Sequence, residues 1–229
     1  MKVLAIDTAN YVMGVALLDE QQVVGEIITN VKKNHSVRLM PAIEQLLKEC
    51  DTKPSDLEKI VVAAGPGSYT GVRIGVTVAK TLAWSLQIPI TGVSSLEVLA
   101  ANASYFDGYI CPLFDARRQQ IYTGLYTYED TLKVKEEERI ILISEWLLLL
   151  KELNQKVLFI GNDLSIHKET IIAALGEQAV FASTAKHNPR PSELGCIGLQ
   201  KESEEVHTFV PNYIRMAEAE ANWLANQAK

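Results

Sequence analysis

The sequence predicts an α/β protein of two fused lobes, each with a mixed β-sheet and flanking helices. Three observations favour this fold class. The chain has 229 residues, which is long for one average domain and short for two large ones. Hydrophobic residues make up 48% and charged residues 22%, as in globular proteins. The two halves repeat one order: a strand, a turn with an acidic residue, a strand, a helix, and a strand that ends in glycine.

The first lobe is expected over residues 1–103. Three segments rich in β-favouring apolar residues open it, and a turn that carries Asp7 and Thr8 separates the first two. These segments are residues 2–6, 13–18 and 23–29. Residues 35–50 place apolar side chains at helical spacing, with Asn34 or Ser36 as the N-cap. A short buried strand, "KIVVA", then leads into a glycine-rich loop.

The second lobe is expected over residues 104–210. "YICPLF", a turn with Asp115 and "QIYTGLYTY" reproduce the strand, acidic turn and strand of the first lobe. "SEWLLLLKELN" predicts a helix, and "KVLFIGNDL" predicts a strand that runs into a glycine. A last alanine-rich helix at 211–229 is expected to dock on the first lobe and complete it.

Charge and hydropathy exclude several classes of protein. The formal net charge of −6 argues against independent binding of nucleic acid, which depends on neutralising phosphates. Two basic pairs, Lys32 with Lys33 and Arg117 with Arg118, are interpreted as solvated loop charges. No apolar run is long enough to cross a bilayer, and Met1 leads straight into a strand-like segment, so we expect a cytoplasmic protein without membrane contact.

The stretch "AGPGSYTGVRIGVTVAKTLAW", residues 64–84, fits none of three catalytic loops. It lacks the Lys of a P-loop, its glycine spacing misses the dinucleotide fingerprint by one residue, and Pro66 and Thr70 stand where a nucleophile elbow needs glycines around Ser68. A structural glycine loop is predicted instead, with either Gly67 or Gly71 at positive φ. Its residues are Gly65, Gly67, Thr70 and Gly71.

A helix is expected to follow this loop, over residues 72–86. Gly75, Ala79 and Ala83 recur every four residues along it and would allow close approach of another element. That element could belong to the same fold or to a partner, and the sequence leaves both possibilities open.

Candidate ligands for metal or nucleotide are few. The four histidines and three cysteines are dispersed, so no protein metal site is expected. Asp7 and Asp115 occupy matching turns and could hold a magnesium nucleotide across a cleft, together with Thr8. They could equally form hydrogen bonds within their own turns.

Five motifs in order resemble the bacterial TsaB family, also called YeaZ, over essentially the whole chain. They are "LAIDTAN", "HSVRLMPAIEQLL", "GPGSYTGVRIGVTVAKTLAW", "DARRQQIY" and "PNYIR". The resemblance implies the two-lobed actin/Hsp70/sugar-kinase (ASKHA) fold, in which tandem RNase H-like units form the lobes.

The resemblance also implies a role in making threonylcarbamoyladenosine at adenosine 37 of tRNAs that read codons beginning with A. In that family TsaD transfers the threonylcarbamoyl group, TsaB is its noncatalytic partner, and TsaE is an ATPase subunit. The two metal-binding histidines of TsaD correspond to Ser95 and Leu99 here. The resemblance therefore implies a chain without catalytic residues, metal or cofactor of its own, with ATP or ADP at most at a subunit junction of the complex.

Two other functions stay open on the residues alone. One is an independent ATPase or kinase-like enzyme that would use Asp7, Thr8 and Asp115. A peptidase is the other, although no nucleophile fits the spacing tests above.

The spacing and the resemblance together single out the helices at 35–50 and 72–86 as the surface that binds TsaD. Free protein is expected to form a homodimer through the same helices, and tRNA is expected to be reached only indirectly, through the complex. Candidate interface residues are Leu39, Met40 and Ile43 on the first helix, and Arg73, Gly75, Val76, Ala79, Lys80 and Ala83 on the second.

Overall fold

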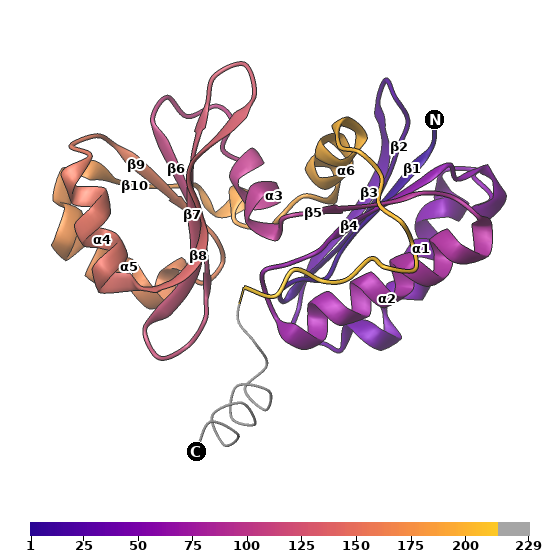
Figure 1. The fold of residues 1–229 in the computed structure, drawn as a ribbon, viewed down its shortest axis with the longest axis horizontal. Helices are drawn as coiled ribbons and strands as arrows, with labels where there is room; N and C mark the ends of the chain where they lie inside the picture. The colour runs from indigo at the N-terminus through magenta and orange to yellow at the C-terminus, as the bar shows by residue number, and fades with distance from the viewer. Residues whose placement is uncertain (215–229) are drawn as a thin grey trace.

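The computed structural model describes residues 1–214, which form two lobes that lie side by side (Figure 1). Each lobe contains one five-stranded mixed sheet, so the predicted fold class is confirmed. The helix predicted at 211–229 lies outside the described residues from residue 215 on. None of the described helices is long and apolar enough to cross a membrane.

The first sheet has the strand order β3-β2-β1-β4-β5. Strands β1, β2 and β3 are antiparallel neighbours, and β4 and β5 run parallel to β1. Every residue of β1, β2 and β4 is buried, which explains their nearly continuous apolar sequences. The strands are β1 (Val3–Asp7), β2 (Val12–Leu18), β3 (Val23–Asn30), β4 (Lys59–Ala63) and β5 (Ile90–Val93).

Two helices from the amino-terminal half, α1 (Leu39–Glu49) and α2 (Tyr69–Leu86), cover one face of this sheet (Figure 1). A short 3₁₀ turn precedes α1, and the Asn34 side chain accepts a hydrogen bond from the Ser36 backbone N–H there, as predicted. The Ser68 side chain caps α2, and Gln87 ends it in a left-handed conformation at φ 57°. The two predicted helices are therefore confirmed.

The second sheet repeats the topology of the first, with the order β10-β9-β6-β7-β8. Strands β6, β7 and β8 are antiparallel neighbours, whereas β9 and β10 run parallel to β6. The predicted duplication is thus present in the structure. The strands are β6 (Tyr109–Asp115), β7 (Gln120–Tyr128), β8 (Leu132–Leu142), β9 (Val157–Ile160) and β10 (Ala179–Phe181), and helices α4 (Ile143–Glu152) and α5 (Leu164–Leu175) pack on the outer face.

The two lobes exchange one helix each, so their boundaries differ from the predicted 1–103 and 104–210. Helix α3 (Ser95–Ala101) buries Leu96 and Leu99 against the second sheet. Helix α6 (Pro191–Gln200) packs on the first sheet, where Gly198 lies against Val61 on the face opposite to α2. The lobe boundaries predicted from the sequence are wrong because α3, which lies in the first half of the chain, packs on the second sheet. Helix α6, which lies in the second half, packs on the first sheet.

Residues 201–214, here called the strap, run along the first lobe after α6. Glu204 forms an isolated antiparallel bridge with Ile90, and the Asn212 backbone N–H donates a 2.7 Å hydrogen bond to the Ala64 carbonyl oxygen. Between them Phe209 is only 3% exposed and belongs to the core of the first lobe. The chain thus returns to the first lobe from α6 onward, ahead of the predicted helix.

Candidate docking face and interlobe cleft

The glycine loop packs directly on the turn between β1 and β2. The Thr8 hydroxyl donates a 2.8 Å hydrogen bond to the Gly71 carbonyl oxygen, and the Ser68 backbone N–H donates to the Ala9 carbonyl oxygen. A Cβ on Gly67 would overlap the Ala9 carbonyl oxygen, and one on Gly71 would overlap that of Thr8. Close backbone contact is therefore what requires glycine at these two positions.

The conformational part of the glycine prediction is wrong. Among Gly65, Gly67 and Gly71, only Gly65 has a positive φ, at 105°. The Gly65 carbonyl oxygen accepts a hydrogen bond from the Ser95 backbone N–H, which links the loop to α3. Thr70 lies exposed in the first turn of α2.

Asp7 ends β1 and is fully enclosed by the first lobe. Its Oδ1 accepts a 2.9 Å hydrogen bond from the Ala9 backbone N–H, whereas Oδ2 has no hydrogen-bond partner among the described residues. Burial raises the pKa of this carboxyl group to about 6. The neighbouring Thr8 hydroxyl donates its hydrogen bond to the Gly71 carbonyl oxygen.

Asp115 ends β6 at the matching place in the second lobe. Its Oδ1 lies 3.0 Å from His167 Nε2, and its backbone N–H donates a 2.9 Å hydrogen bond to Asp163 Oδ2. Burial raises the pKa of the Asp163 carboxyl group. Both aspartates thus form hydrogen bonds within their own lobes, and the described residues contain no cluster of three His, Cys, Asp or Glu side chains that could hold a metal ion.

Most of the predicted interface residues face the interior of the first lobe, which corrects that prediction. The side chains of Val76, Ala79 and Ala83 are buried in the core, and a Cβ on Gly75 would lie 2.5 Å from Thr8 Oγ1. The small-residue stripe lets α2 approach its own sheet closely, so a partner cannot contact it in this conformation. Leu39 and Ile43 of α1 are buried in the same core.

Lys80 also has a different role from the predicted one. Its Nζ donates hydrogen bonds of 3.0 Å and 2.7 Å to the carbonyl oxygens of His207 and Phe209, and so holds the strap on α2. Of the nine predicted interface residues, Met40 and Arg73 are the exposed ones.

The exposed side of α2 forms a shallow groove with the 3₁₀ turn before α1. Its volume is about 450 Å³. The Arg73 guanidinium lies 4.7 Å from the Tyr69 ring centroid and donates a 2.7 Å hydrogen bond to the Tyr69 hydroxyl. We call this groove the docking face; its residues are Ser36, Tyr69, Thr70, Arg73, Ile74, Thr77 and Val78.

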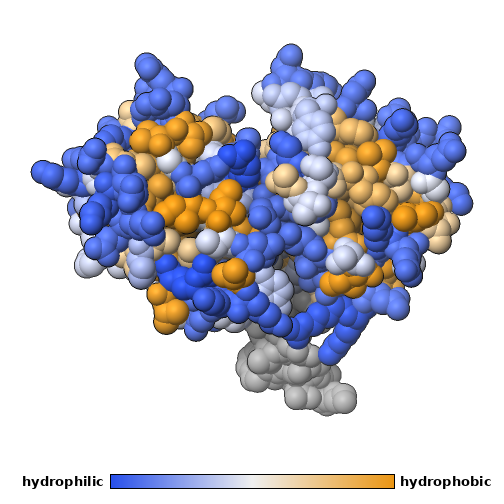
Figure 2. All heavy atoms as spheres, turned by 180° about the vertical axis from the view of Figure 1, so that it is seen from behind, coloured by the Kyte–Doolittle hydropathy of each residue, from blue (hydrophilic) through white to orange (hydrophobic). Residues whose placement is uncertain are grey.

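The sequence analysis did not select Ile74, Thr77 and Val78. A helical projection could have found them: Thr77, two residues from both Gly75 and Ala79, lies opposite the small-residue stripe, and Ile74 and Val78, each one residue before a stripe residue, lie about a quarter turn away from it. Exposure alone would not have sufficed: Figure 2 shows apolar residues in separate patches on both lobes. The docking face combines apolar side chains with a hollow in the surface.

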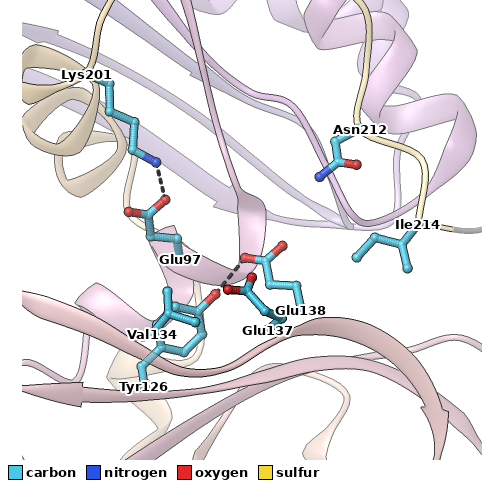
Figure 3. Close-up of a pocket in the computed structure, with 8 residues that line it drawn as sticks. All are labelled: Glu97, Tyr126, Val134, Glu137, Glu138, Lys201, Asn212 and Ile214. Atoms are coloured by element: carbon cyan, nitrogen blue, oxygen red, sulfur yellow. Dashed lines mark hydrogen bonds and ion pairs between the residues drawn. The ribbon is translucent and has the colours of Figure 1, made fainter.

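A second cavity, of about 370 Å³, lies between the lobes (Figure 3). It is lined from α3, from β7 and β8, and from the strap and its first residue, Lys201. The lining residues are Glu97, Tyr126, Val134, Glu137, Glu138, Lys201, Asn212 and Ile214.

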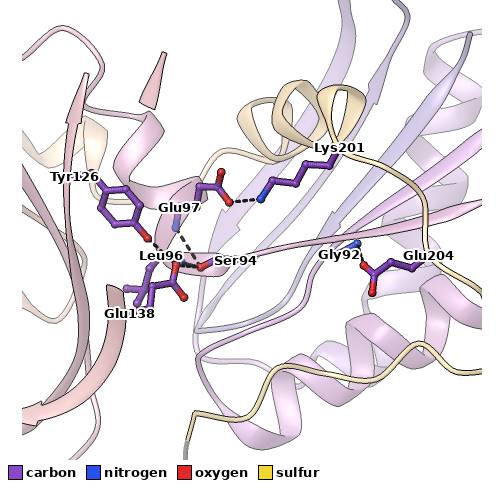
Figure 4. A network of polar contacts seen from close by, with 8 residues as sticks. All are labelled: Gly92, Ser94, Leu96, Glu97, Tyr126, Glu138, Lys201 and Glu204. Carbon is purple, nitrogen blue, oxygen red and sulfur yellow. Dashed lines mark hydrogen bonds and ion pairs between the residues drawn. The ribbon is translucent and has the colours of Figure 1, made fainter. Parts of the chain in front are cut away.

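Polar contacts in this cavity tie its walls together (Figure 4). Glu138 Oε1 accepts hydrogen bonds from the Tyr126 hydroxyl, at 2.6 Å, and from the hydroxyl of Ser94, the N-cap of α3. Lys201 forms a 2.5 Å ion pair with Glu97 of α3. Burial raises the pKa of Glu138. Glu138 therefore joins β8 to the start of α3, and Glu97 joins α3 to the strap; they are two of the three acidic residues that line the cavity.

The duplicated sheets, each with three antiparallel and two parallel strands, and the exchanged helices define a two-lobed protein of the actin/Hsp70/sugar-kinase class. The family model described as TsaD, tRNA N6-adenosine threonylcarbamoyltransferase, matches residues 22–223. The chain is 58% identical to the tRNA threonylcarbamoyladenosine biosynthesis protein TsaB of Bacillus subtilis over 228 residues, 99% of this chain and all of that protein. The chain belongs to the TsaB family.

Other relatives agree with this assignment. The TsaB protein of Buchnera aphidicola from Schizaphis graminum is 33% identical, over 70% of this chain and 78% of its own length. A crystal structure from Pseudomonas aeruginosa, of an uncharacterized protein with similarity to the peptidase YeaZ, superimposes with a TM-score of 0.80 at 26% identity, covering 93% of this chain and 99% of that one.

Proposed function

We propose that this chain is a noncatalytic scaffold subunit that binds and activates the threonylcarbamoyl-transferring subunit, TsaD, for modification of tRNA. The observation that carries the proposal is the docking face, a groove on the free surface of the first lobe that combines Tyr69, Ile74 and Val78 with four polar residues. TsaE is the third member of the complex in this proposal, and ATP or ADP would bind only at a junction between subunits.

The composition of the docking face suits a protein partner. Ile74 and Val78 are half-buried in the groove, and Met40, which lies outside the docking face in the first turn of α1, is 46% exposed. Tyrosine and arginine, here Tyr69 and Arg73, are enriched among residues that dominate protein interfaces. An isolated chain leaves this surface in water, so it gains by covering it with TsaD or, when alone, with a second copy of itself.

The noncatalytic part of the proposal has its own support. Thr8, Asp115 and one oxygen of Asp7 form hydrogen bonds within their lobes. Ser95 and Leu99, which correspond to the metal-binding histidines of TsaD, are buried where α3 packs on the second lobe. An independent ATPase would have to release several of these contacts before it could bind a magnesium nucleotide.

The test uses one exposed position in the docking face. Thr77→Arg places a long charged side chain in the groove without entering the core, so the variant should fold like the wild type. Ser85→Arg is the matched control, because Ser85 is exposed near the end of the same helix and outside the groove.

Each variant is co-expressed with tagged TsaD, the amount recovered is compared, and threonylcarbamoyladenosine in the tRNA is measured by mass spectrometry of nucleosides. We expect Thr77→Arg to weaken binding at least tenfold and to lower modification, because it introduces an unpaired charge into a desolvated contact. Ser85→Arg should behave like the wild type. Normal recovery and normal modification with Thr77→Arg would refute the docking face.

A further inference from the structure

Charge is distributed unevenly between the two ends of the sheets. The loops at the carboxyl ends of β1, β3, β4, β6 and β9 contain four basic residues and one acidic residue, Asp163, whose carboxylate accepts the hydrogen bond from the Asp115 backbone; Asp7 and Asp115 end β1 and β6 at the same edge and form hydrogen bonds within their own lobes. Loops at the opposite ends are acidic. They carry Asp19, Glu20, Asp51, Asp56, Glu58, Asp107, Glu129 and Asp130, against the two lysines Lys53 and Lys156. Although the net charge of the chain is −6, the loops at one end of the sheets are therefore basic.

Both lobes contribute to that basic end. Lys32 and Lys33 follow β3 in the first lobe, and Arg117 and Arg118 follow β6 in the second; we call these four exposed residues the basic edge. Within the described residues, Lys32, Lys33 and Arg117 form no ion pair with an acidic side chain. These three cations are therefore available to an anionic partner.

The two basic pairs flank one junction between the lobes. Asn30 Nδ2 donates a 3.2 Å hydrogen bond to Asn162 Oδ1, and the next residue, Asp163, binds the Asp115 backbone N–H. Lys32 lies two residues after Asn30 and Arg117 lies two residues after Asp115, which is at most about 7 Å of chain in each case. Each lobe therefore places one basic pair close to this contact between the lobes.

The arginine pair stands on a fixed and unusual turn. Arg117, Arg118 and Gln119 have φ values of 64°, 53° and 60°, which residues with side chains rarely adopt. The Gln119 carbonyl oxygen accepts a 2.9 Å hydrogen bond from the Ile143 backbone N–H at the start of α4. Strained backbone of this kind is retained mainly where it serves binding or function.

An aromatic ring accompanies the lysine pair. The Lys32 ammonium lies 5.8 Å from the centroid of the Tyr11 ring, and Tyr11 is 59% exposed. Basic side chains next to exposed aromatic rings suit RNA, whose phosphates pair with the cations and whose unpaired bases stack on the rings. An acidic protein segment would use the cations and leave the ring without a role.

From these observations we infer that the basic edge contacts the phosphate backbone of tRNA directly. The inference rests on the proposed function for the identity of the RNA, and it replaces the expectation that tRNA is reached only through the partner. Ser36 of the docking face lies three residues after Lys33, so TsaD bound there leaves the basic edge beside it. Because the whole chain is acidic, the edge is expected to add affinity within the complex and to bind tRNA only weakly by itself.

The experiment compares three charge-reversed proteins. Lys32→Glu/Lys33→Glu removes the basic pair of the first lobe, and Arg117→Glu removes one charge from the second. Lys151→Glu/Lys156→Glu is the matched control, since both lysines are exposed and lie at the opposite end of the second lobe, at the end of α4 and before β9. Binding of fluorescently labelled, unmodified tRNA is measured by anisotropy from 50 to 200 mM salt, with each protein alone and in its complex with TsaD.

We expect Lys32→Glu/Lys33→Glu to weaken tRNA binding by the complex about tenfold and to reduce the salt slope by about one for each phosphate that is no longer neutralised. Arg117→Glu should have a smaller effect of the same kind, and the control should match the wild type. Unchanged tRNA affinity in both edge variants overturns the inference. Edge variants that lose TsaD binding but keep tRNA binding also overturn it, because the basic edge would then be a protein interface. The two proposals can be told apart. If Thr77→Arg leaves TsaD binding intact while the edge variants weaken tRNA binding by the protein alone, the proposed docking face is refuted and the proposed tRNA contact of the basic edge is supported.

Discussion

The Thr8 hydroxyl donates its hydrogen bond to the carbonyl oxygen of Gly71, across 63 residues of sequence. This contact brings the turn after β1 onto the first turn of α2, where the backbones meet without intervening side chains. The polar groups of this turn thus hold the first lobe together.

Replacing Gly71 by alanine should destabilise the protein by about 2 kcal/mol or more, because the added methyl group overlaps the Thr8 carbonyl oxygen and either the turn or the helix must shift. Thr70→Ala, at the exposed neighbouring position, should change the free energy of unfolding by less than about 0.5 kcal/mol. Urea denaturation followed by circular dichroism measures both. Equal stabilities for the two variants would show that the turn accommodates a Cβ without strain.

Ala79→Arg distinguishes the buried stripe of α2 from its exposed side. Ala79 has no solvent exposure, so arginine there must either displace α2 from the sheet or bury a charge, and we expect a loss of more than about 2 kcal/mol in unfolding free energy. Thr77→Arg, two residues away and exposed, should keep the wild-type melting temperature within a few degrees. A stable, well-folded Ala79→Arg protein would contradict the packing of α2 described above.

The pattern of apolar and polar residues predicted those elements that pack against the next element along the chain. The hairpin of β1 and β2 and that of β6 and β7 have apolar strands on either side of a short polar turn, and both formed as expected. The turns also brought Asp7 and Asp115 to equivalent places in the two lobes.

Other features depend on contacts that a single sequence does not display. Helix α2 has two apolar stripes, one through Ala79 and one through Val78, and only the position of the sheet decides which is buried. The exchange of α3 and α6 is hidden for the same reason, because each helix lies next to one lobe in sequence and packs on the other. Strand β8 was missed because its middle, "KEEER", is charged, as suits an exposed edge strand.

The strap provides a further prediction. The Phe209 ring packs in the first-lobe core and would lie 2.8 Å from a Cβ on Gly92, so Phe209→Ala should leave a cavity and cost about 3 kcal/mol. Val210→Ala is the control, because Val210 is 70% exposed and should contribute less than about 0.5 kcal/mol. Thermal unfolding measures the difference. If Phe209→Ala is as stable as its control, the strap does not hold the first lobe together.

Asp7 predicts a specific dependence of stability on pH. Its pKa in the folded protein is about 6, above the value of 3.8 for an exposed aspartate, because burial disfavours the charged form. A raised pKa means that the folded state binds the proton more tightly than the unfolded state does. The stability that Asp7 contributes is therefore fully present below pH 3.8 and is lost as the pH rises through about 6.

Asparagine at this position is neutral at every pH and keeps an oxygen for the Ala9 backbone N–H. The difference in unfolding free energy between Asp7→Asn and the wild type should thus shift in favour of the variant by about 2.5 kcal/mol between pH 4 and pH 8, since about two pKa units separate the folded and unfolded states and the unfolded aspartate is already partly ionised at pH 4. Urea titrations of both proteins at a series of pH values give this difference directly, and the other titrating groups cancel in it. A difference that stays constant across the range would mean that Asp7 is solvated or paired in the folded protein, and would reopen its candidacy as a ligand for a cation.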